Sequence, residues 1–446
     1  MKNSKELYVV YCIDTEGPLH ESLQATFDRI NVLFGLKLKP SKANLRKLQC
    51  LELDVKNKEE IAKVLDSHLL AYNDTWNKVD EMLDRIMTKQ YREQFLDSNG
   101  RGIIYNWHCI DHVGFSSNER RRDIGFGNIF NHYQEKIDEH GGIDKIHWHF
   151  HPIAFAREAH MSATSYSNST NILHEIITRR VIDNSWFPTV NRAGFHTVRR
   201  DSSIFLEEWI PFDYSNQAQY NFNDSVQKDV VDGRFGDWRR APKLWKPYHP
   251  SYSDYQSPGS MNRYSTKCLN IGTRLRLLTE FEIRKAFELA RDEGKAILSF
   301  TNHDFRDMSI DIEDTYEKIL RVAKEFNDVK VFNSDAIEAM QKYCYSDDNI
   351  VKNKIKLTCK VQTQDNIRKL VVSQENGAVF GTQPYLAIKT KDGRYYHDNF
   401  DELEFGKSWV YTFDWDTLLL EQIEILKVAA NDKYGNSVVY SVELRS

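Results

Sequence analysis

Three histidines alternate within one short stretch of this sequence, in the run Ile146-His-Trp-His-Phe-His-Pro152. In an extended chain, residues i, i+2 and i+4 point to one face, so the rings of His147, His149 and His151 can share it. Imidazole is the commonest metal-binding side chain and titrates near neutrality. Burying three such rings for structural reasons alone would require a separate set of partners for each. The run therefore indicates a metal site.

Two carboxylates near the N-terminus are candidates to complete this site. Asp14 and Glu16 lie in Cys12-Ile-Asp-Thr-Glu-Gly-Pro18, directly after a short apolar run. Taken alone, this segment is more simply interpreted as a strand cap or a solvated turn, and only the histidines favour a functional role. Catalytic zinc binds histidine nitrogen and carboxylate oxygen and keeps one position for water. Because hydrolysis also needs a base, two carboxylates two residues apart can divide these duties.

The elements that must position these residues are alternating strands and helices. Apolar runs predict strands over 8–13, 103–109, 145–151, 296–300 and 329–332, with helical periodicity between them. Thr279 and Glu282 form a capping box that opens a helix ending at Gly294. Polar residues collect just after the strands, as at His303. We therefore expect an α/β sheet or barrel whose site lies at the carboxyl edge of the strands.

The pattern changes after Cys344. A polar linker over 345–354 precedes alternating Ile355, Leu357, Cys359 and Val361, and Asp392-Gly393 marks a hairpin. This pattern predicts a β-sandwich of immunoglobulin-like size over 355–446. The chain should thus contain two domains, a catalytic one over 1–345 and the sandwich.

Composition narrows the classes of function. The chain is 41% hydrophobic and 28% charged, with a net charge of −5 and no long run of either sign. Nucleic acid and anionic membranes are therefore unfavoured partners. No segment has the length and apolarity of a membrane span or a signal peptide, and the six cysteines are scattered, which favours the cytoplasm.

In their order along the chain, these residues resemble the signature of polysaccharide deacetylases with a NodB-homology domain, the carbohydrate esterase 4 type. That signature runs Asp-Asp or Asp-x-Asp, His-x-x-x-His, an Arg-x-Pro-like segment, an Asp, and a Leu-x-His-like segment. The segments that match it are Asp14-Thr-Glu16, His147-Trp-His-Phe-His151, Arg192-Ala-Gly-Phe195, Asp213 and Ser299-Phe-Thr-Asn-His303. The resemblance spans residues 7 to 340 loosely and implies a distorted (β/α) barrel.

The resemblance also implies a divalent metal, most simply Zn²⁺, held by Glu16, His147 and His151. Glu16 replaces the usual Asp, and the gap before His147 is longer than in typical members. A helical insertion over about 35–95 is therefore expected to cover the site.

The same resemblance implies the catalytic roles. Asp14 would be the base, oriented by Arg192, and His303 would be the general acid, tuned by Asp213. Arg192 is not followed by the usual Pro, and no Leu lies two positions before His303. The implied reaction is metal-dependent hydrolysis of an N-acetyl group on a sugar.

Three further residues are candidate substrate contacts: His149, Asp111 and Trp238. His149 could also be a third metal ligand, although the family's ligands are at i and i+4, and a core hydrogen bond is as good an interpretation as a substrate contact. A loop rich in Trp and Tyr around 237–249 usually packs on itself. The expected partner is an N-acetylated sugar or glycan, such as a nucleotide- or lipid-linked precursor of surface polysaccharide or lipopolysaccharide. The sequence predicts no oligomeric state.

Two alternatives remain at this point. One is a non-catalytic carbohydrate-binding or assembly protein that kept the scaffold, with binding on the β-sandwich. The other is a glycosidase that uses two carboxylates without a metal, against which the histidines argue.

Overall fold

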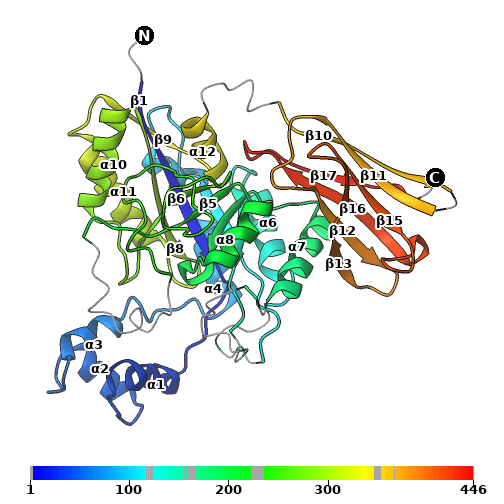
Figure 1. Ribbon diagram of the computed structural model, residues 1–446. Helices are drawn as coiled ribbons and strands as arrows, with labels where there is room; N and C mark the ends of the chain where they lie inside the picture. Colours follow the sequence, from blue (N-terminus) through cyan, green and yellow to red (C-terminus); the bar gives the residue numbers. More distant parts are fainter. Residues whose placement is uncertain are drawn as a thin grey trace.

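The computed structural model describes residues 4–116, 118, 120, 124–154, 157, 166–167, 169–221, 236–345, 353–365 and 367–444. Within these residues a parallel sheet with surrounding helices occupies the N-terminal part of the chain, and antiparallel sheets occupy the C-terminal part (Figure 1). Most of the linker predicted over 345–354 lies outside the described residues.

The described part of the parallel sheet forms a nearly closed barrel. Its strand order is β6-β5-β4-β3-β2-β1-β8-β7, and β9 pairs with β1. Only Cys268 separates β6 from β7, so these two short strands bring the two ends of the order together. The strands are β1 (Lys5–Thr15), β2 (Tyr105–Cys109), β3 (Lys145–Phe150), β4 (Val190–Ala193), β5 (Phe212–Asn216), β6 (Tyr264–Lys267), β7 (Leu269–Asn270), β8 (Lys295–His303) and β9 (Val329–Asn333).

Strand β1 pairs with three other strands of the barrel. One of its edges pairs with β8, and the other pairs with β9 along its first half and with β2 along its second half. Such a strand is covered on both faces, which explains its continuous apolar run from Leu7 to Ile13. The run ends at Asp14, where the strand reaches the carboxyl edge of the barrel.

Helices surround the barrel, and several begin or end where the sequence indicates. Thr279 accepts a hydrogen bond from the amide of Glu282, and Gly294 ends that helix with a φ of 93°. Among the described residues, the α-helices after β2 are α6 (Asn128–Glu139), α7 (Thr170–Asn184), α8 (Arg200–Trp209), α10 (Glu280–Glu293), α11 (Ser309–Ala323) and α12 (Ala336–Cys344), and a 3₁₀ turn, η2 (Gly194–His196), follows β4.

Five α-helices lie between β1 and β2. They are α1 (Leu23–Phe34), α2 (Lys42–Gln49), α3 (Lys58–Val64), α4 (Trp76–Ile86) and α5 (Lys89–Arg92). Four of them lie within the insertion predicted over about 35–95, and α1 precedes that range. Helix α4 buries Val79, Leu83 and Ile86 in the barrel's own core. Helices α1 to α3 instead share a small separate core and project from the barrel (Figure 1). We call residues 21–71, which contain α1 to α3, the helical lobe.

The C-terminal part forms two four-stranded antiparallel sheets around a common apolar core. One has the order β10-β11-β15-β14 and the other β13-β12-β16-β17. Their strands are β10 (Lys356–Gln364), β11 (Ile367–Asn376), β12 (Tyr385–Thr390), β13 (Tyr395–Asp398), β14 (Asp401–Glu404), β15 (Ser408–Phe413), β16 (Ile423–Asn431) and β17 (Ser437–Ser441). None of the described helices has the length and apolar character that crossing a membrane requires.

The second antiparallel sheet packs against α7. Tyr385 and Ala429 share an apolar cluster with Leu173 and Ile176 of that helix. The Tyr385 hydroxyl lies 3.0 Å from Thr178 Oγ1 and donates to the main-chain oxygen of His174 at 2.9 Å. The antiparallel sheets therefore cover part of the barrel's outer surface.

Candidate metal centre

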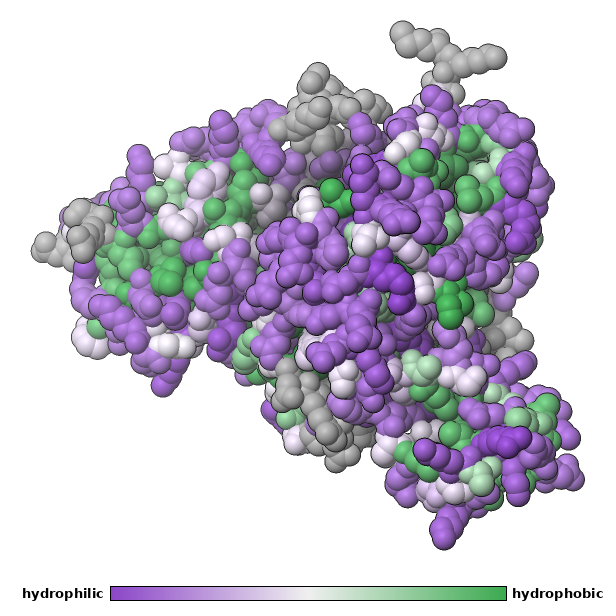
Figure 2. Space-filling model, turned by 180° about the vertical axis from the view of Figure 1, so that it is seen from behind, coloured by the Kyte–Doolittle hydropathy of each residue, from purple (hydrophilic) through white to green (hydrophobic). Residues whose placement is uncertain are grey.

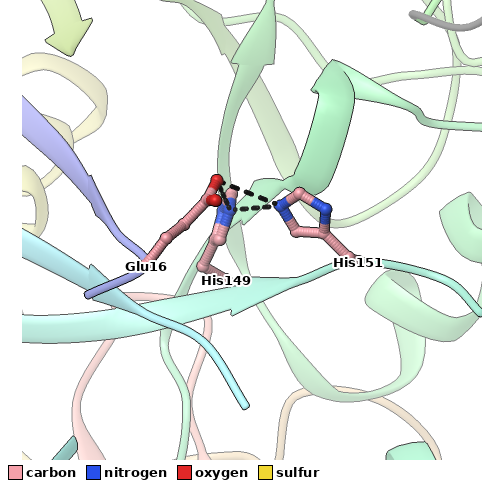
Figure 3. Close-up of side chains that lie close together, drawn as sticks. All are labelled: Glu16, His149 and His151. Atoms are coloured by element: carbon pink, nitrogen blue, oxygen red, sulfur yellow. Dashed lines mark hydrogen bonds and ion pairs between the residues drawn. The ribbon is translucent and has the colours of Figure 1, made fainter. Parts of the chain in front are cut away.

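Glu16, His149 and His151 bring three ligand atoms together at the carboxyl edge of the barrel (Figure 3). The two Nε2 atoms are 3.0 Å apart. Glu16 Oε1 lies 3.5 Å from Nε2 of His151 and 4.0 Å from Nε2 of His149. All three side chains are buried. Because zinc binds nitrogen and oxygen at about 2 Å, atoms at this spacing fit around one ion. The described residues thus contain a candidate metal-binding group.

A hydrogen bond to the main chain sets the tautomer of His149. Its Nδ1 lies 2.7 Å from the main-chain oxygen of Arg192. Since a carbonyl oxygen only accepts, Nδ1 carries the proton and Nε2 presents a lone pair. Burial lowers the pKa of His149 well below its usual value, and the neighbouring His151 lowers it further. Both effects favour the neutral form of the ring.

His151 approaches this group through a space that only glycine leaves open. Strand β3 ends at Phe150, so His151 lies just beyond it. A Cβ atom on Gly194 would lie 2.2 Å from Cδ2 of His151. On the other side, the rings of His151 and Phe195 meet edge to face with centroids 4.7 Å apart. Gly194 and Phe195 together fix the position of this imidazole.

Asp304 holds the main chain at Glu16. Its Oδ1 accepts from the amide of Glu16 at 2.9 Å, and its Oδ2 accepts from the amide of Gly17 at 2.8 Å. Oδ2 also accepts from the Tyr133 hydroxyl at 2.9 Å. The turn that this carboxylate supports needs a glycine, because Gly17 has a φ of 69°. Asp304 is not among the site residues predicted from the sequence, although an acid directly after His303 at a strand end was a signal for it.

Asp14 and His303 lie beside the candidate ligands. The Arg192 Nε forms an ion pair with Asp14 Oδ1 at 2.8 Å and donates a hydrogen bond to Thr301 Oγ1 at 3.2 Å. Nε2 of His303 is 3.7 Å from Asp14 Oδ2 and 3.8 Å from Glu16 Oε1. Burial raises the pKa of Asp14 to about 6, and the Arg192 guanidinium opposes that rise. The arrangement offers a carboxylate base and an imidazole acid on neighbouring strands.

The structure places His147 away from this group. Its Nε2 lies 3.0 Å from Asn106 Oδ1, and its ring centroid is 5.1 Å from that of His108. His149, expected as a substrate contact, therefore replaces His147 in the candidate ligand set. The physical reason is the tilt of barrel strands, which staggers the register by about one residue per strand. In the hydrogen-bond ladder Asp14 pairs with His108 and His108 pairs with His147, so over two strands the residue level with Asp14 becomes His149.

Asp213 is tied into the barrel wall. It is fully buried and accepts hydrogen bonds at 2.6 Å from both Asn191 Nδ2 and Ser215 Oγ. Arg263 Nη1 lies 3.6 Å from its other carboxylate oxygen. These partners join β4, β5 and the start of β6. These partners hold Asp213 in place, and its expected tuning of His303 stays a prediction.

The other two expected substrate contacts are also held internally. Asp111 accepts from Arg180 Nη2 at 2.6 Å and from the amide of Gly127. Trp238 is 1% exposed, and its Nε1 donates to the main-chain oxygen of His196 at 2.9 Å. Neither side chain presents a surface on which a sugar ring could stack. Both side chains therefore have internal structural partners, and contact with a substrate stays a prediction.

Comparison with known proteins adds no relative: no family model, no curated protein and no solved structure matches this chain.

Proposed function

We propose that this protein is a metal-dependent hydrolase that removes an N-acetyl group from a sugar, as a divergent relative of the polysaccharide deacetylases. The observation that carries the proposal is the convergence of the His149 and His151 Nε2 atoms on the Glu16 carboxylate. Asp14 and His303 beside this group supply the acid–base pair that amide hydrolysis needs. The histidine spacing, i and i+2, differs from the His-x-x-x-His of that family.

The donor set favours zinc. Two neutral imidazoles and one carboxylate are the three protein ligands of many catalytic zinc sites. When bound, zinc polarises the substrate carbonyl and lowers the pKa of a water to about 7. The proton on Nδ1 of His149 keeps its other nitrogen available, as in histidine ligands generally.

The proton transfers belong to the chain's own residues. Arg192 holds Asp14 by one carboxylate oxygen, so the other is directed toward His303 and can take a proton from the attacking water. His303 keeps 22% of its side chain exposed, the most of these groups, and can protonate the departing amine. The Arg192 side chain is fully buried, so the orientation of Asp14 is fixed before substrate binds.

The substrate we propose is a nucleotide- or lipid-linked N-acetylated sugar of surface polysaccharide or lipopolysaccharide biosynthesis. The test is an acetate-release assay over such sugars and chitin oligosaccharides. We expect release that a zinc chelator stops and added Zn²⁺ restores. Asp14→Asn should lose activity by about 10²- to 10⁴-fold while the protein still binds zinc.

The matched control is Asp138→Asn, which changes an exposed carboxylate on α6 in the same way. It should leave acetate release unchanged. Full activity in Asp14→Asn, or a purified protein that takes up no zinc, would contradict the proposal. Sugar binding without any acetate release would favour the non-catalytic alternative.

A further inference from the structure

The helical lobe contains a basic stretch without acidic residues. From Arg29 to Leu51 the sequence has six Lys or Arg residues and no Asp or Glu. The whole chain has 65 acidic residues among 446, so a stretch of this length would ordinarily contain several. The charge of this segment is therefore opposite in sign to that of the protein as a whole.

Five of these six cations are exposed and have no acidic partner. Arg29 pairs with Glu21 at 2.9 Å. The other five, which we call the basic strip, take part in no ion pair within the described residues: Lys37, Lys39, Lys42, Arg46 and Lys47. Exposed cations elsewhere are often paired, as Arg101 is with Glu338 and Arg321 is with Glu280. The basic strip thus leaves its positive charge available to a partner.

The local fold gathers these cations on the outside of the lobe. Leu36 and Leu38 alternate with Lys37 and Lys39 and pack against the lobe's core, so the two lysines point outward. Lys42 and Arg46 follow one helical turn apart on α2.

Apolar side chains are exposed next to the strip in the sequence. Val32 is 81% exposed and Leu51 is 43% exposed. Figure 2 shows the lobe from behind as a projection in which hydrophobic residues are visible among hydrophilic ones. The lobe therefore combines free cations with exposed aliphatic groups.

The base of the lobe lies beside the metal centre. The amide of Leu19 donates to the oxygen of Asn73 at 3.0 Å, which closes the lobe at its base. The amide of Asn73 donates to the oxygen of Phe305 at 2.7 Å, and its side chain donates to the oxygen of Asp304 at 3.0 Å. The lobe is thus anchored next to the residues that hold Glu16 and carry His303.

We propose that the basic strip docks the protein on an anionic phospholipid surface. Lysines near anionic headgroups gain electrostatic energy, and aliphatic side chains can enter the boundary between headgroups and acyl chains. The net charge of −5 disfavours an anionic partner, but this value is a sum over the whole chain. Because charges at the surface are screened beyond about 10 Å at 0.1 M salt, the local charge of the strip matters more for docking. A nucleic-acid surface would favour arginine and stacking aromatics, and the strip has four lysines, one arginine and aliphatic neighbours.

The experiment is co-sedimentation of the full-length protein with vesicles of phosphatidylcholine, alone or with about one third phosphatidylglycerol. We expect binding to the anionic vesicles only, and release near 1 M salt, where the screening length falls to about 3 Å. The strip variant carries Lys37→Gln, Lys39→Gln, Lys42→Gln, Arg46→Gln and Lys47→Gln. Its binding to the anionic vesicles should be weaker by at least about tenfold, because each lost cation removes favourable electrostatic energy.

The matched control removes five other exposed lysines that have no ion pair within the described residues: Lys324, Lys330, Lys356, Lys360 and Lys391, each changed to Gln. It should bind anionic vesicles like the unchanged protein. The proposal is overturned if the unchanged protein does not bind, if the control loses as much binding as the strip variant, or if duplex DNA binds more tightly than the vesicles.

Zinc content and circular dichroism of the strip variant separate this result from misfolding and from the metal chemistry. Both should match the unchanged protein, because no residue of the strip contacts the metal centre in the described structure. Docking needs no turnover, so it stands even where acetate release fails. If the proposed function holds, docking would bring the active site to sugars that are linked to lipids of the same surface. Only this consequence rests on the proposed function.

Discussion

His149 donates a hydrogen bond from Nδ1 to the main-chain oxygen of Arg192 at 2.7 Å, and this contact joins a candidate metal ligand to the strand that orients Asp14. The hydrogen bond determines which ring nitrogen faces Glu16. His147, two residues earlier, uses its Nε2 to contact Asn106 instead. The two histidines therefore have separable roles.

Replacing each of these histidines distinguishes the two possible ligand sets. His149→Ala should lose bound zinc, because it removes one of three ligands. His147→Ala should keep zinc and lose about 1–3 kcal/mol of unfolding free energy, since it breaks a buried hydrogen bond. Zinc per chain after dialysis and urea unfolding measure the two effects. Zinc lost from His147→Ala but retained in His149→Ala would restore the ligand set that the sequence resemblance implies.

Asp304 should control metal affinity without binding the metal. Asp304→Asn places an amide group against three donors, so the turn at Glu16 should loosen. Partners of this kind change metal affinity by about 10- to 100-fold, which a competition titration with a chromophoric chelator can measure. Tyr133→Phe removes only one of the three hydrogen bonds and should have a smaller effect. Equal zinc affinity in all three proteins would show that Asp304 does not position Glu16.

A single methyl group at Gly194 should displace His151. The added Cβ would lie 2.2 Å from that imidazole, so the ring must move and Gly194→Ala should weaken zinc binding. Gly125→Ala is the matched control, because a Cβ there meets no atom within 4 Å. The same titration compares the two variants. If Gly194→Ala binds zinc normally, His151 is not held in the position described.

Asp111 should contribute to stability and not to substrate affinity. Its partner Arg180 has only 4% of its side chain exposed, so Asp111→Asn leaves a buried guanidinium without its counter-charge. Breaking a buried ion pair in this way costs about 3–5 kcal/mol, which should lower the urea midpoint of the apo and zinc forms alike. A raised KM with unchanged stability would return Asp111 to the substrate site.

His397 should make the protein less stable as the pH falls. Burial, together with the neighbouring His174, lowers its pKa to about 3. The unfolded chain has the ordinary value near 6.5, so below pH 6.5 the unfolded state binds a proton that the folded state does not. Stability therefore decreases from pH 6.5 down to about 3, by about 2 kcal/mol at pH 5 for this one residue.

The variant His397→Gln isolates this contribution. Unfolding free energies of the apo proteins at pH 7.5 and pH 5 should differ less for His397→Gln than for the unchanged protein. The comparison removes the contributions of other buried histidines, which both proteins share. Identical pH dependence of the two proteins would mean that His397 takes up its proton at the same pH in the folded and the unfolded state.

The sequence predicted the edge of the barrel at which the site assembles. The apolar run of β1 ends at Asp14 and that of β8 ends near His303, and parallel strands bring their carboxyl ends to one edge. Period-two alternation after Ile355 likewise indicated the antiparallel sheets.

The ligand set could not be chosen from the sequence. Alternation places His147, His149 and His151 on one face, but it does not give the height of each residue along the barrel axis. That height depends on strand tilt, which only the closed sheet determines. Asp304 was missed for a related reason, because its partners are main-chain amides of another strand end.

The hydrogen bonds at the end of the chain have a consequence for how the molecule can be divided. Lys427 Nζ donates to the oxygen of Ile182 at 2.8 Å, and the Asn431 side chain donates to the oxygens of Pro188 and Trp209 at 2.6 and 2.9 Å. Separating the parallel part from the antiparallel part would leave these carbonyl oxygens without their hydrogen-bond donors. It would also expose the aromatic surface around Tyr385. The C-terminal sheets are thus an integral part of the barrel's packing and not a separable module.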